Sequence, residues 1–130
     1  KEQAYPQLFA KCFTPLQIDG SMGVTAGITE MLIQSHEGLI DLLPALPDQC
    51  ADGEFHGVCV RGGFEIDMKW KNKRITTAKV YSKAGKTCRI YAGVPVRVIK
   101  KDRPVELKKH ADGYIEFKTV EGASYKLMIQ

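Results

Sequence analysis

The sequence predicts a mainly β chain, an antiparallel β-sandwich over residues 48–130 that is preceded by one helix and an apolar connecting segment. Residues 64–71 alternate apolar and polar side chains with a period of two, which is typical of a strand with one face in a core and the other in water. Short segments of this kind, separated by turn residues, continue to the end of the chain, as in a sandwich. Residues 22–36 instead show spacings of three and four, which are typical of a helix.

The segment before the helix is expected to be a loop. Residues 1–15 contain two X-Pro steps, and proline disfavours helix in the residue before it, so at most a short helix over residues 8–13 is expected there. Residues 39–47 form an apolar run broken by two prolines, as expected of a buried extended segment between two modules. We therefore expect two units, residues 1–47 and residues 48–130.

The helix expected over residues 22–36 has marked ends. Gly38 lies just beyond it and is the residue type that ends a helix in a left-handed turn. Asp19 lies directly ahead of it, where free backbone N–H groups and the helix dipole favour a carboxylate. The apolar side chains of the helix cover a wide arc, so it should pack on several neighbours.

The β part is expected to contain seven strands after the turn at Gly62-Gly63. Trp70 continues the apolar series of the first strand and is expected in the core. The strands are predicted over residues 64–70, 75–82, 87–92, 94–99, 105–107, 114–119 and 124–129, with turns at residues 71–73, 84–85, 102–104, 112–113 and 121–122.

Composition excludes several classes of function. The 130 residues, 44% of them hydrophobic, suffice for one ordinary domain with a packed core. The net charge of +4 comes from basic residues that mostly alternate with apolar ones, as on solvated strand faces, so no nucleic-acid partner is expected. No apolar run approaches the roughly 20 residues of a membrane span.

The four cysteines indicate packing and no metal site. Cys12, Cys50, Cys59 and Cys88 form no C-x-x-C pair and have no paired histidines near them. Their even number permits two disulfides, but buried free thiols are the commoner arrangement in a domain of this size. Cys59 and Cys88 fall within apolar β segments, so we expect both to pack in the core.

Four sequence blocks, taken in order, carry a family resemblance. They are IDG at residues 18–20, TAGITEMLIQSHEG at residues 25–38, LLPALP at residues 42–47 and RGGFEIDMKW at residues 61–70. Together they resemble the C-terminal part of family 95 glycoside hydrolases, the inverting α-L-fucosidases. One departure is that the family commonly has DGN followed by an aromatic residue and Gly, where this chain has Asp19, Gly20, Ser21, Met22 and Gly23.

The resemblance implies a fold and an activity for a longer protein. The chain would supply the last helix of a catalytic (α/α)6 barrel and the C-terminal β domain. The whole enzyme would hydrolyse terminal α-1,2-linked L-fucose with inversion, without a metal or organic cofactor, and α-L-galactosidase activity is the alternative within the family. Its partners would be a fucosylated glycan and the remainder of the barrel, its location secreted or periplasmic, and the 130-residue chain alone would be inactive.

Asp19 is the predicted catalytic residue. Inverting hydrolysis requires an acid that protonates the leaving oxygen and a base that activates water, and one carboxylate cannot do both. The resemblance implies that a Glu earlier in the barrel is the acid and that two Asn residues hold the water, assisted by the Asp of the IDG motif, which is Asp19. The alternative is that Asp19 only caps the helix.

The remaining polar candidates are expected to be structural. His36 is expected to interact with the helix end, with a sugar contact as the alternative. Glu30 and Glu37 match no catalytic position of the family, and His56 and His110 are expected on the surface.

Two other functions stay open. The first is an autonomous β-sandwich that binds carbohydrate or a partner, with an aromatic platform drawn from Trp70, Tyr81, Tyr91 and Tyr114. Burial of Trp70 and Tyr91 would weigh against it. The second is self-association through the apolar arc of the helix, for which Met31 and Leu32 are the expected contact residues.

Overall fold

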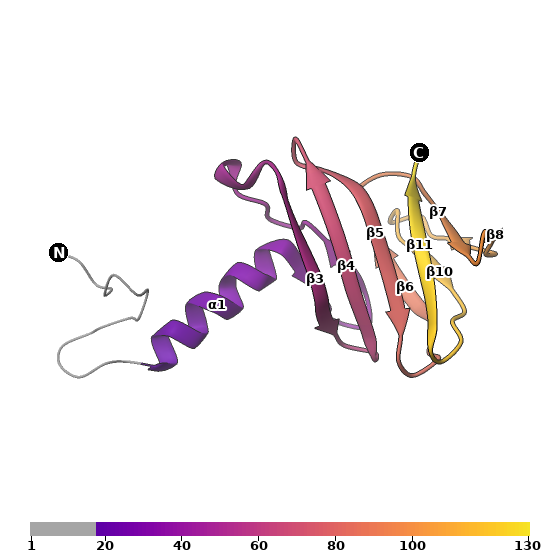
Figure 1. Ribbon diagram of the computed structural model, residues 1–130, viewed down its shortest axis with the longest axis horizontal. Helices are drawn as coiled ribbons and strands as arrows, with labels where there is room; N and C mark the ends of the chain where they lie inside the picture. The colour runs from indigo at the N-terminus through magenta and orange to yellow at the C-terminus, as the bar shows by residue number, and fades with distance from the viewer. Residues whose placement is uncertain (1–17) are drawn as a thin grey trace.

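The computed structural model describes residues 18–130, which form one helix and two β-sheets packed face to face (Figure 1). The loop expected over residues 1–15, its short helix and Cys12 lie outside the described residues. The elements are α1 (Ile18–Leu32), β1 (Ile33–Gln34), β2 (Ile40–Leu42), the 3-10 helix η1 (Asp48–Cys50), β3 (Gly53–Val60), β4 (Phe64–Lys71), β5 (Arg74–Ser82), β6 (Cys88–Tyr91), β7 (Val96–Lys100), β8 (Arg103–Pro104), β9 (Lys108–Lys109), β10 (Ile115–Phe117) and β11 (Ala123–Ile129).

The two sheets confirm the predicted mainly β sandwich. The six-stranded sheet has the order β3-β4-β5-β11-β7-β8, and the five-stranded sheet has the order β1-β2-β6-β10-β9. All pairings are antiparallel except that of β2 with β6, which is parallel. In Figure 1, β6 and β10 appear behind β5 and β11, so the two layers enclose one core.

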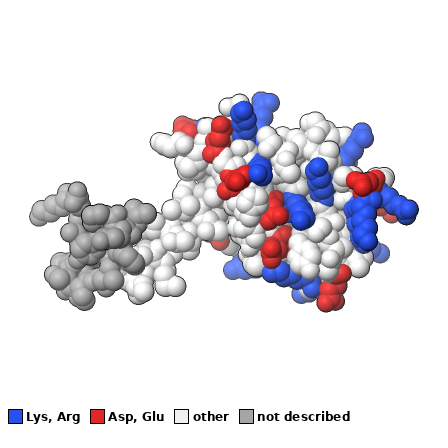
Figure 2. Space-filling model, in the orientation of Figure 1, with Lys and Arg blue, Asp and Glu red and all other residues white. Residues whose placement is uncertain are grey.

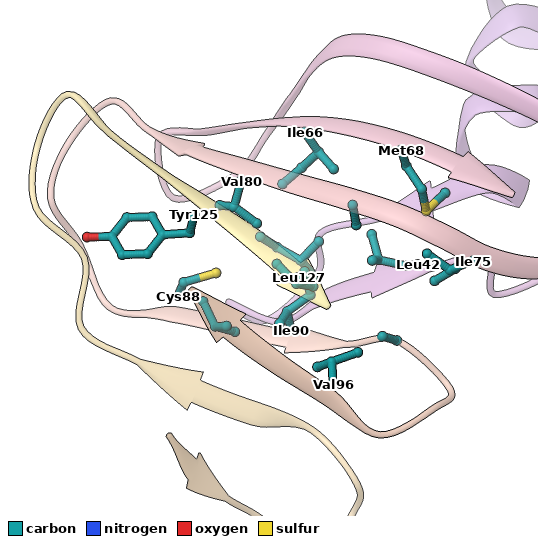
Figure 3. Packing of buried hydrophobic residues seen from close by; sticks show 14 of the residues in the cluster. Leu42, Ile66, Met68, Ile75, Val80, Cys88, Ile90, Val96, Tyr125 and Leu127 are labelled. Carbon is teal, nitrogen blue, oxygen red and sulfur yellow. The ribbon is translucent and has the colours of Figure 1, made fainter. Parts of the chain in front are cut away.

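The core lies between the facing sides of the two sheets (Figure 3). Ile66, Val80 and Leu127 of the six-stranded sheet and Ile90 of the five-stranded sheet are at most 1% exposed. Trp70 is 7% exposed, as predicted, and its indole N–H donates to the carbonyl of Cys50 at 2.9 Å. Burying this residue type with its N–H satisfied stabilises the end of β4.

The predicted turns are confirmed where the backbone requires positive φ. Asn72 and Lys73 between β4 and β5 have φ of 50° and 60°, and Gly62 and Gly63 before β4 have φ of 93° and 78°. Two successive residues with positive φ match the right-handed twist of a hairpin, which explains why β3, β4 and β5 are neighbours.

The strand predicted over residues 105–107 was wrong. The chain there leaves β8 in the six-stranded sheet and enters β9 in the five-stranded sheet. Val105 still donates its N–H to the carbonyl of Val98 at 2.9 Å, and the chain then crosses between the layers. Because it changes sheets within these three residues, it cannot continue as one strand.

Helix α1 begins and ends four residues earlier than the predicted helix of residues 22–36. It ends at Leu32 because the chain returning from β2 takes up its last carbonyl groups. Leu43 donates its N–H to the carbonyl of Leu32 at 2.9 Å, and Ala45 donates to that of Met31 at 3.2 Å. Ile33 is then free to enter the sheet, where it is 3% exposed. Gly38 does adopt positive φ, but in the turn between β1 and β2 and not at the helix end.

The apolar run of residues 39–47 joins the core of the sandwich. Ile40 and Leu42 are 2% and 3% exposed, and β2 pairs with β6, in which Ile40 lies opposite Ile90. Along the chain, the sandwich therefore begins with β1 at Ile33, directly after α1.

Helix α1 projects away from the sandwich (Figure 1). None of its residues is buried. Four large apolar side chains are at least half exposed: Ile18 (64%), Met22 (68%), Val24 (63%) and Ile28 (50%). Figure 2 shows Lys, Arg, Asp and Glu mixed over the β part, whereas the helix shows mostly uncharged atoms.

Candidate functional site

Asp19 lies in the first turn of α1, as its second residue, and not ahead of the helix as expected. It is exposed, and within residues 18–130 its carboxylate has no hydrogen-bond or ion-pair partner. The unpaired N–H groups and the dipole of the first turn still favour a negative charge there. Within residues 18–130, the site thus offers one exposed carboxylate, at the end of α1 that is remote from the sandwich.

The described residues bring no second carboxylate to Asp19. Glu30 lies eleven residues further along the same helix, which is about 16 Å at a rise of 1.5 Å per residue. The two carboxyl groups of an inverting glycosidase lie only about 6.5–9.5 Å apart. Glu37 is further still, exposed in the turn between β1 and β2. Residues 18–130 therefore do not contain a complete acid and base pair around Asp19.

His36 joins the base of α1 to the six-stranded sheet. It lies four residues beyond the helix but, as expected, it interacts with the helix end, through Glu30 in the last turn of α1. Its Nε2 is 3.0 Å from Oε2 of Glu30, and its Nδ1 is 2.9 Å from Nη1 of Arg61. The backbone N–H of Arg61 also donates to Oγ of Ser35 at 3.2 Å. Arg61 lies between β3 and β4, and no pattern in the sequence would pair it with a residue 25 positions earlier.

A cleft of about 310 Å³ opens beside the end of β6 and the start of β10. The ring of Tyr91 and the residues 92–95 that follow it form one part of its lining, and Lys109, His110 and Gly113 form another. Tyr91 is 36% exposed. An aromatic residue that is exposed at a cleft is available for contact with a ligand.

The four aromatic residues of the expected platform do not form one surface. Trp70 is buried, and Tyr81 lies on β5 in the other sheet. Tyr114 is covered, because the His110 ring stacks on it with centroids 4.0 Å apart and the guanidinium of Arg89 lies 4.7 Å from its centroid. Tyr91 alone of the four presents an exposed ring at the cleft.

Polar groups beside Tyr114 form a compact network on the five-stranded sheet. Arg89 donates from Nη2 to the hydroxyl of Tyr114 at 2.8 Å. The carboxylate of Glu116 lies 3.6 Å from Nε of Arg89 and 3.7 Å from Nε2 of His110, two buried nitrogens that have no hydrogen-bond partner within residues 18–130. His110 is thus partly buried and not on the surface as expected, whereas His56 is exposed as expected.

The cysteines of the described part differ in their surroundings. Cys88 is buried in the core, as expected, and burial raises the pKa of its thiol to about 12. Cys59 is exposed, contrary to expectation, because β3 is an edge strand and this side chain faces away from the core. Cys50 is also exposed, and all three are free thiols. Residues 18–130 contain no group of three or more His, Cys, Asp or Glu that could hold a metal ion.

The partial burial of Asp41, on β2, affects the pKa of its carboxyl group. It lies beside Tyr91 in the parallel pairing of β2 with β6. Desolvation raises the pKa of its carboxyl group.

Over residues 18–130, no helix has the length and apolar character needed to cross a membrane.

Comparisons with known proteins identify the β part. The family described as glycoside hydrolase family 95, C-terminal domain, matches residues 34–127. A curated protein of Arabidopsis thaliana, alpha-L-fucosidase 2, is 36% identical over 92 residues, which are 67% of this chain and 11% of that protein. The chain thus spans about a tenth of the length of this relative. The family match begins after α1, so it does not include Asp19.

Proposed function

Because the chain belongs to glycoside hydrolase family 95, whose C-terminal domain it contains, we propose that it is the C-terminal part of an enzyme that hydrolyses terminal α-1,2-linked L-fucose with inversion. The name of the Arabidopsis relative supports L-fucose as the sugar. The 11% share of that relative's length supports a longer parent protein.

The observation that carries this proposal is the uncovered apolar arc of α1. A helix with four large apolar side chains at least half exposed and none buried needs neighbours, because apolar surface gains free energy when it leaves water. We assign α1 as the last helix of a catalytic (α/α)6 barrel, and the rest of that barrel as its cover. The β-sandwich, which begins with β1 at Ile33, would brace the barrel end and complete the assembly.

Asp19 then takes one of the roles that inverting hydrolysis requires. The start of α1 lies at the end remote from the sandwich (Figure 1), so in the barrel its carboxylate would face residues of the preceding part. Ionised beside the helix N-terminus, Asp19 would assist the base side of the reaction by orienting the attacking water. The acid that protonates the leaving oxygen would come from the preceding part, because no second carboxylate lies near Asp19 in residues 18–130.

The 130-residue chain alone is expected to be inactive. Within residues 18–130 it offers a single exposed carboxylate at this site, without the acid and without walls that exclude water and position the sugar. No metal or organic cofactor is part of the proposed reaction.

The test is hydrolysis of an α-1,2-fucosylated oligosaccharide by the parent protein. Four samples are compared: the parent, its Asp19→Asn variant, its Glu30→Gln variant as a control on the same helix, and the 130-residue chain. Proton NMR of the first product gives the anomer, which is the β form if the configuration inverts. Thermal unfolding of each variant reports folding.

We expect fucose release by the parent with inversion, a loss of at least about a hundredfold in Asp19→Asn, near-normal activity in Glu30→Gln and none in the short chain. Activity on L-galactosides but not on fucosides would overturn the proposal that L-fucose is the sugar of the substrate. A rate that falls in Asp19→Asn only in proportion to lost folding would make Asp19 a helix cap.

A further inference from the structure

We propose that the cleft beside β6 and β10 is a carbohydrate-binding site that takes one pyranose ring, stacked on the side chain of Tyr91. It lies on the five-stranded sheet, whose strands appear behind the six-stranded sheet in Figure 1. Binding there is separate from the hydrolysis proposed above, because it requires neither Asp19 nor the preceding part of an enzyme.

The cleft has the size and form of a small ligand site. Its volume of about 310 Å³ is at the lower end of the range of about 300–1,000 Å³ that is usual for ligand pockets. Residues 92–95, in the connection from β6 to β7, and the turn at Gly113 flank it. The two flanks come from connections of neighbouring strands, since β6 pairs with β10.

The ring of Tyr91 is held in place. Gly113 has φ of 83°, which only glycine adopts readily, and a Cβ at this position would lie 3.1 Å from Cε2 of Tyr91. The absence of a side chain at Gly113 therefore lets the turn approach the ring closely. The backbone of Tyr91 is fixed from the other side by its pairing with β2. A ring that is already positioned loses little entropy when a ligand stacks on it.

Tyr114 also lines the cleft. Its hydroxyl oxygen accepts a hydrogen bond from Arg89, so its own O–H remains available to donate, and it has no acceptor within residues 18–130. The stacked His110 and the guanidinium of Arg89 hold the ring of Tyr114. Lys109 adds a cationic donor to the lining.

These features favour a sugar over other small ligands. A pyranose has an apolar face of C–H groups, which suits an exposed aromatic ring, and a rim of hydroxyls, which suits nearby donors. No carboxylate of residues 18–130 lines the cleft, so the described lining does not select a cationic ligand. A wholly apolar ligand would leave the polar lining unpaired, which costs free energy.

Tyr81 offers a matched control for Tyr91. The two tyrosines are 37% and 36% exposed, each on a strand, but Tyr81 lies on the other sheet and outside this cleft. The experiment uses the 130-residue chain labelled with nitrogen-15, titrated with the methyl glycosides of L-fucose, D-galactose and D-glucose at millimolar concentrations. Amide shifts of Gly93 and Gly113 report binding at the cleft, and the same spectra show whether each variant is folded.

We expect saturable shifts at Gly93 and Gly113 for at least one sugar, a roughly tenfold rise in Kd for Tyr91→Leu and no change for Tyr81→Leu. A saturation-transfer experiment on the unaltered chain tests the stacking without any substitution. When tyrosine ring protons are saturated, the signals of the bound sugar should weaken. Absence of shifts for all three sugars, or equal losses in the two variants, would overturn the proposal. Retained binding in a parent protein that does not cleave fucosides would leave this site standing while the proposed hydrolysis falls.

Discussion

The guanidinium of Arg61 donates a hydrogen bond to Nδ1 of His36, with Nη1 and Nδ1 2.9 Å apart. An arginine has only donors, so Nδ1 must act as the acceptor and the ring proton resides on Nε2. Nε2 then donates to the carboxylate of Glu30 at 3.0 Å. The His36 imidazole thereby connects the last turn of α1 to the connection between β3 and β4.

Replacing Arg61 by alanine should loosen the attachment of α1 to the sandwich. The substitution removes one exposed hydrogen bond, so the free energy of unfolding should fall by only about 0.3–1 kcal/mol. The orientation of the helix should change more, because its direct contacts with the sheets are largely confined to β1. Hydrogen exchange should quicken over residues 28–34 and remain unchanged in β4 and β5.

Arg103→Ala is the control for this experiment. Arg103 is an exposed arginine on β8, and it has no hydrogen bond or ion pair through its side chain within residues 18–130. If the two variants exchange alike over residues 28–34, the link through His36 does not orient the helix.

Gly53→Ala should destabilise the sandwich. A Cβ at Gly53 would lie 2.4 Å from Cζ2 of Trp70, and the ring cannot move away because it is buried and its indole N–H is bound to Cys50. Overpacking of this kind costs about 1–3 kcal/mol. Chemical denaturation of the 130-residue chain, followed by tryptophan fluorescence, measures the loss.

Gly27→Ala should act in the opposite direction. Gly27 lies in the interior of α1, and apart from the backbone of the helix itself no atom of residues 18–130 lies within 4 Å of an added Cβ, so alanine gains about 0.5–1 kcal/mol in helix propensity without a clash. Helical ellipticity in the far ultraviolet should increase. If Gly53→Ala and Gly27→Ala changed the free energy of unfolding equally, this result would contradict the assigned packing of Trp70.

The parts of the fold that the sequence predicted are those determined locally. The period of two in β4 places Phe64, Ile66, Met68 and Trp70 in the core, and all four are buried. The turns are equally local, because residues such as Asn72 and Gly113 tolerate positive φ. These features depend on neighbours in the sequence and not on the rest of the molecule.

The parts that could not be predicted depend on distant residues. Helix α1 ends at Leu32 because the N–H groups of Leu43 and Ala45 return to its carbonyls, and no pattern within the helix contains that information. The link from His36 to Arg61 and the approach of Gly113 to Tyr91 likewise arise when separate strands meet. The chemical role of Asp19 depends on groups outside residues 18–130 and stays a prediction.

Alkylation of native protein should distinguish Cys88 from Cys50 and Cys59. The thiolate is the reactive form, and burial raises the pKa of Cys88 to about 12, so at mildly alkaline pH it is both protonated and inaccessible. Cys50 and Cys59 are exposed. Mass spectrometry of peptides after brief treatment with iodoacetamide should find these two modified and Cys88 unmodified, and all three modified in denaturant. Rapid modification of native Cys88 would contradict its place in the core.

The 130-residue chain should self-associate when it is produced alone. Ile18, Met22, Val24 and Ile28 are exposed together on α1 and have no cover in residues 18–130. Light scattering after gel filtration should show dimers or larger species. Replacing Met22 and Ile28 together by glutamate should return a monomer, whereas Met31 and Leu32, the contact residues expected from the sequence, are partly covered at the base of the helix. A monomer before any substitution would contradict the expectation.

Asp41→Asn should stabilise the fold at neutral pH, with a dependence on pH that identifies the cause. Desolvation raises the pKa of Asp41 above 3.8 in the folded state, so just above pH 3.8 the folded state binds more protons than the unfolded state. The contribution of Asp41 to the free energy of unfolding therefore falls as pH rises through this window and is constant above it. Asparagine keeps the shape of the side chain and cannot ionise.

The free energy of unfolding of the Asp41→Asn variant should equal that of the unaltered chain below pH 3.8. At pH 7 it should be higher by about 0.5 kcal/mol or less, the usual range for partly exposed positions. Urea denaturation at several pH values measures the difference. Asp112→Asn, in an exposed turn, should show no such trend. A gain in Asp41→Asn that is the same at all pH values would assign the effect to packing and not to desolvation of the charge.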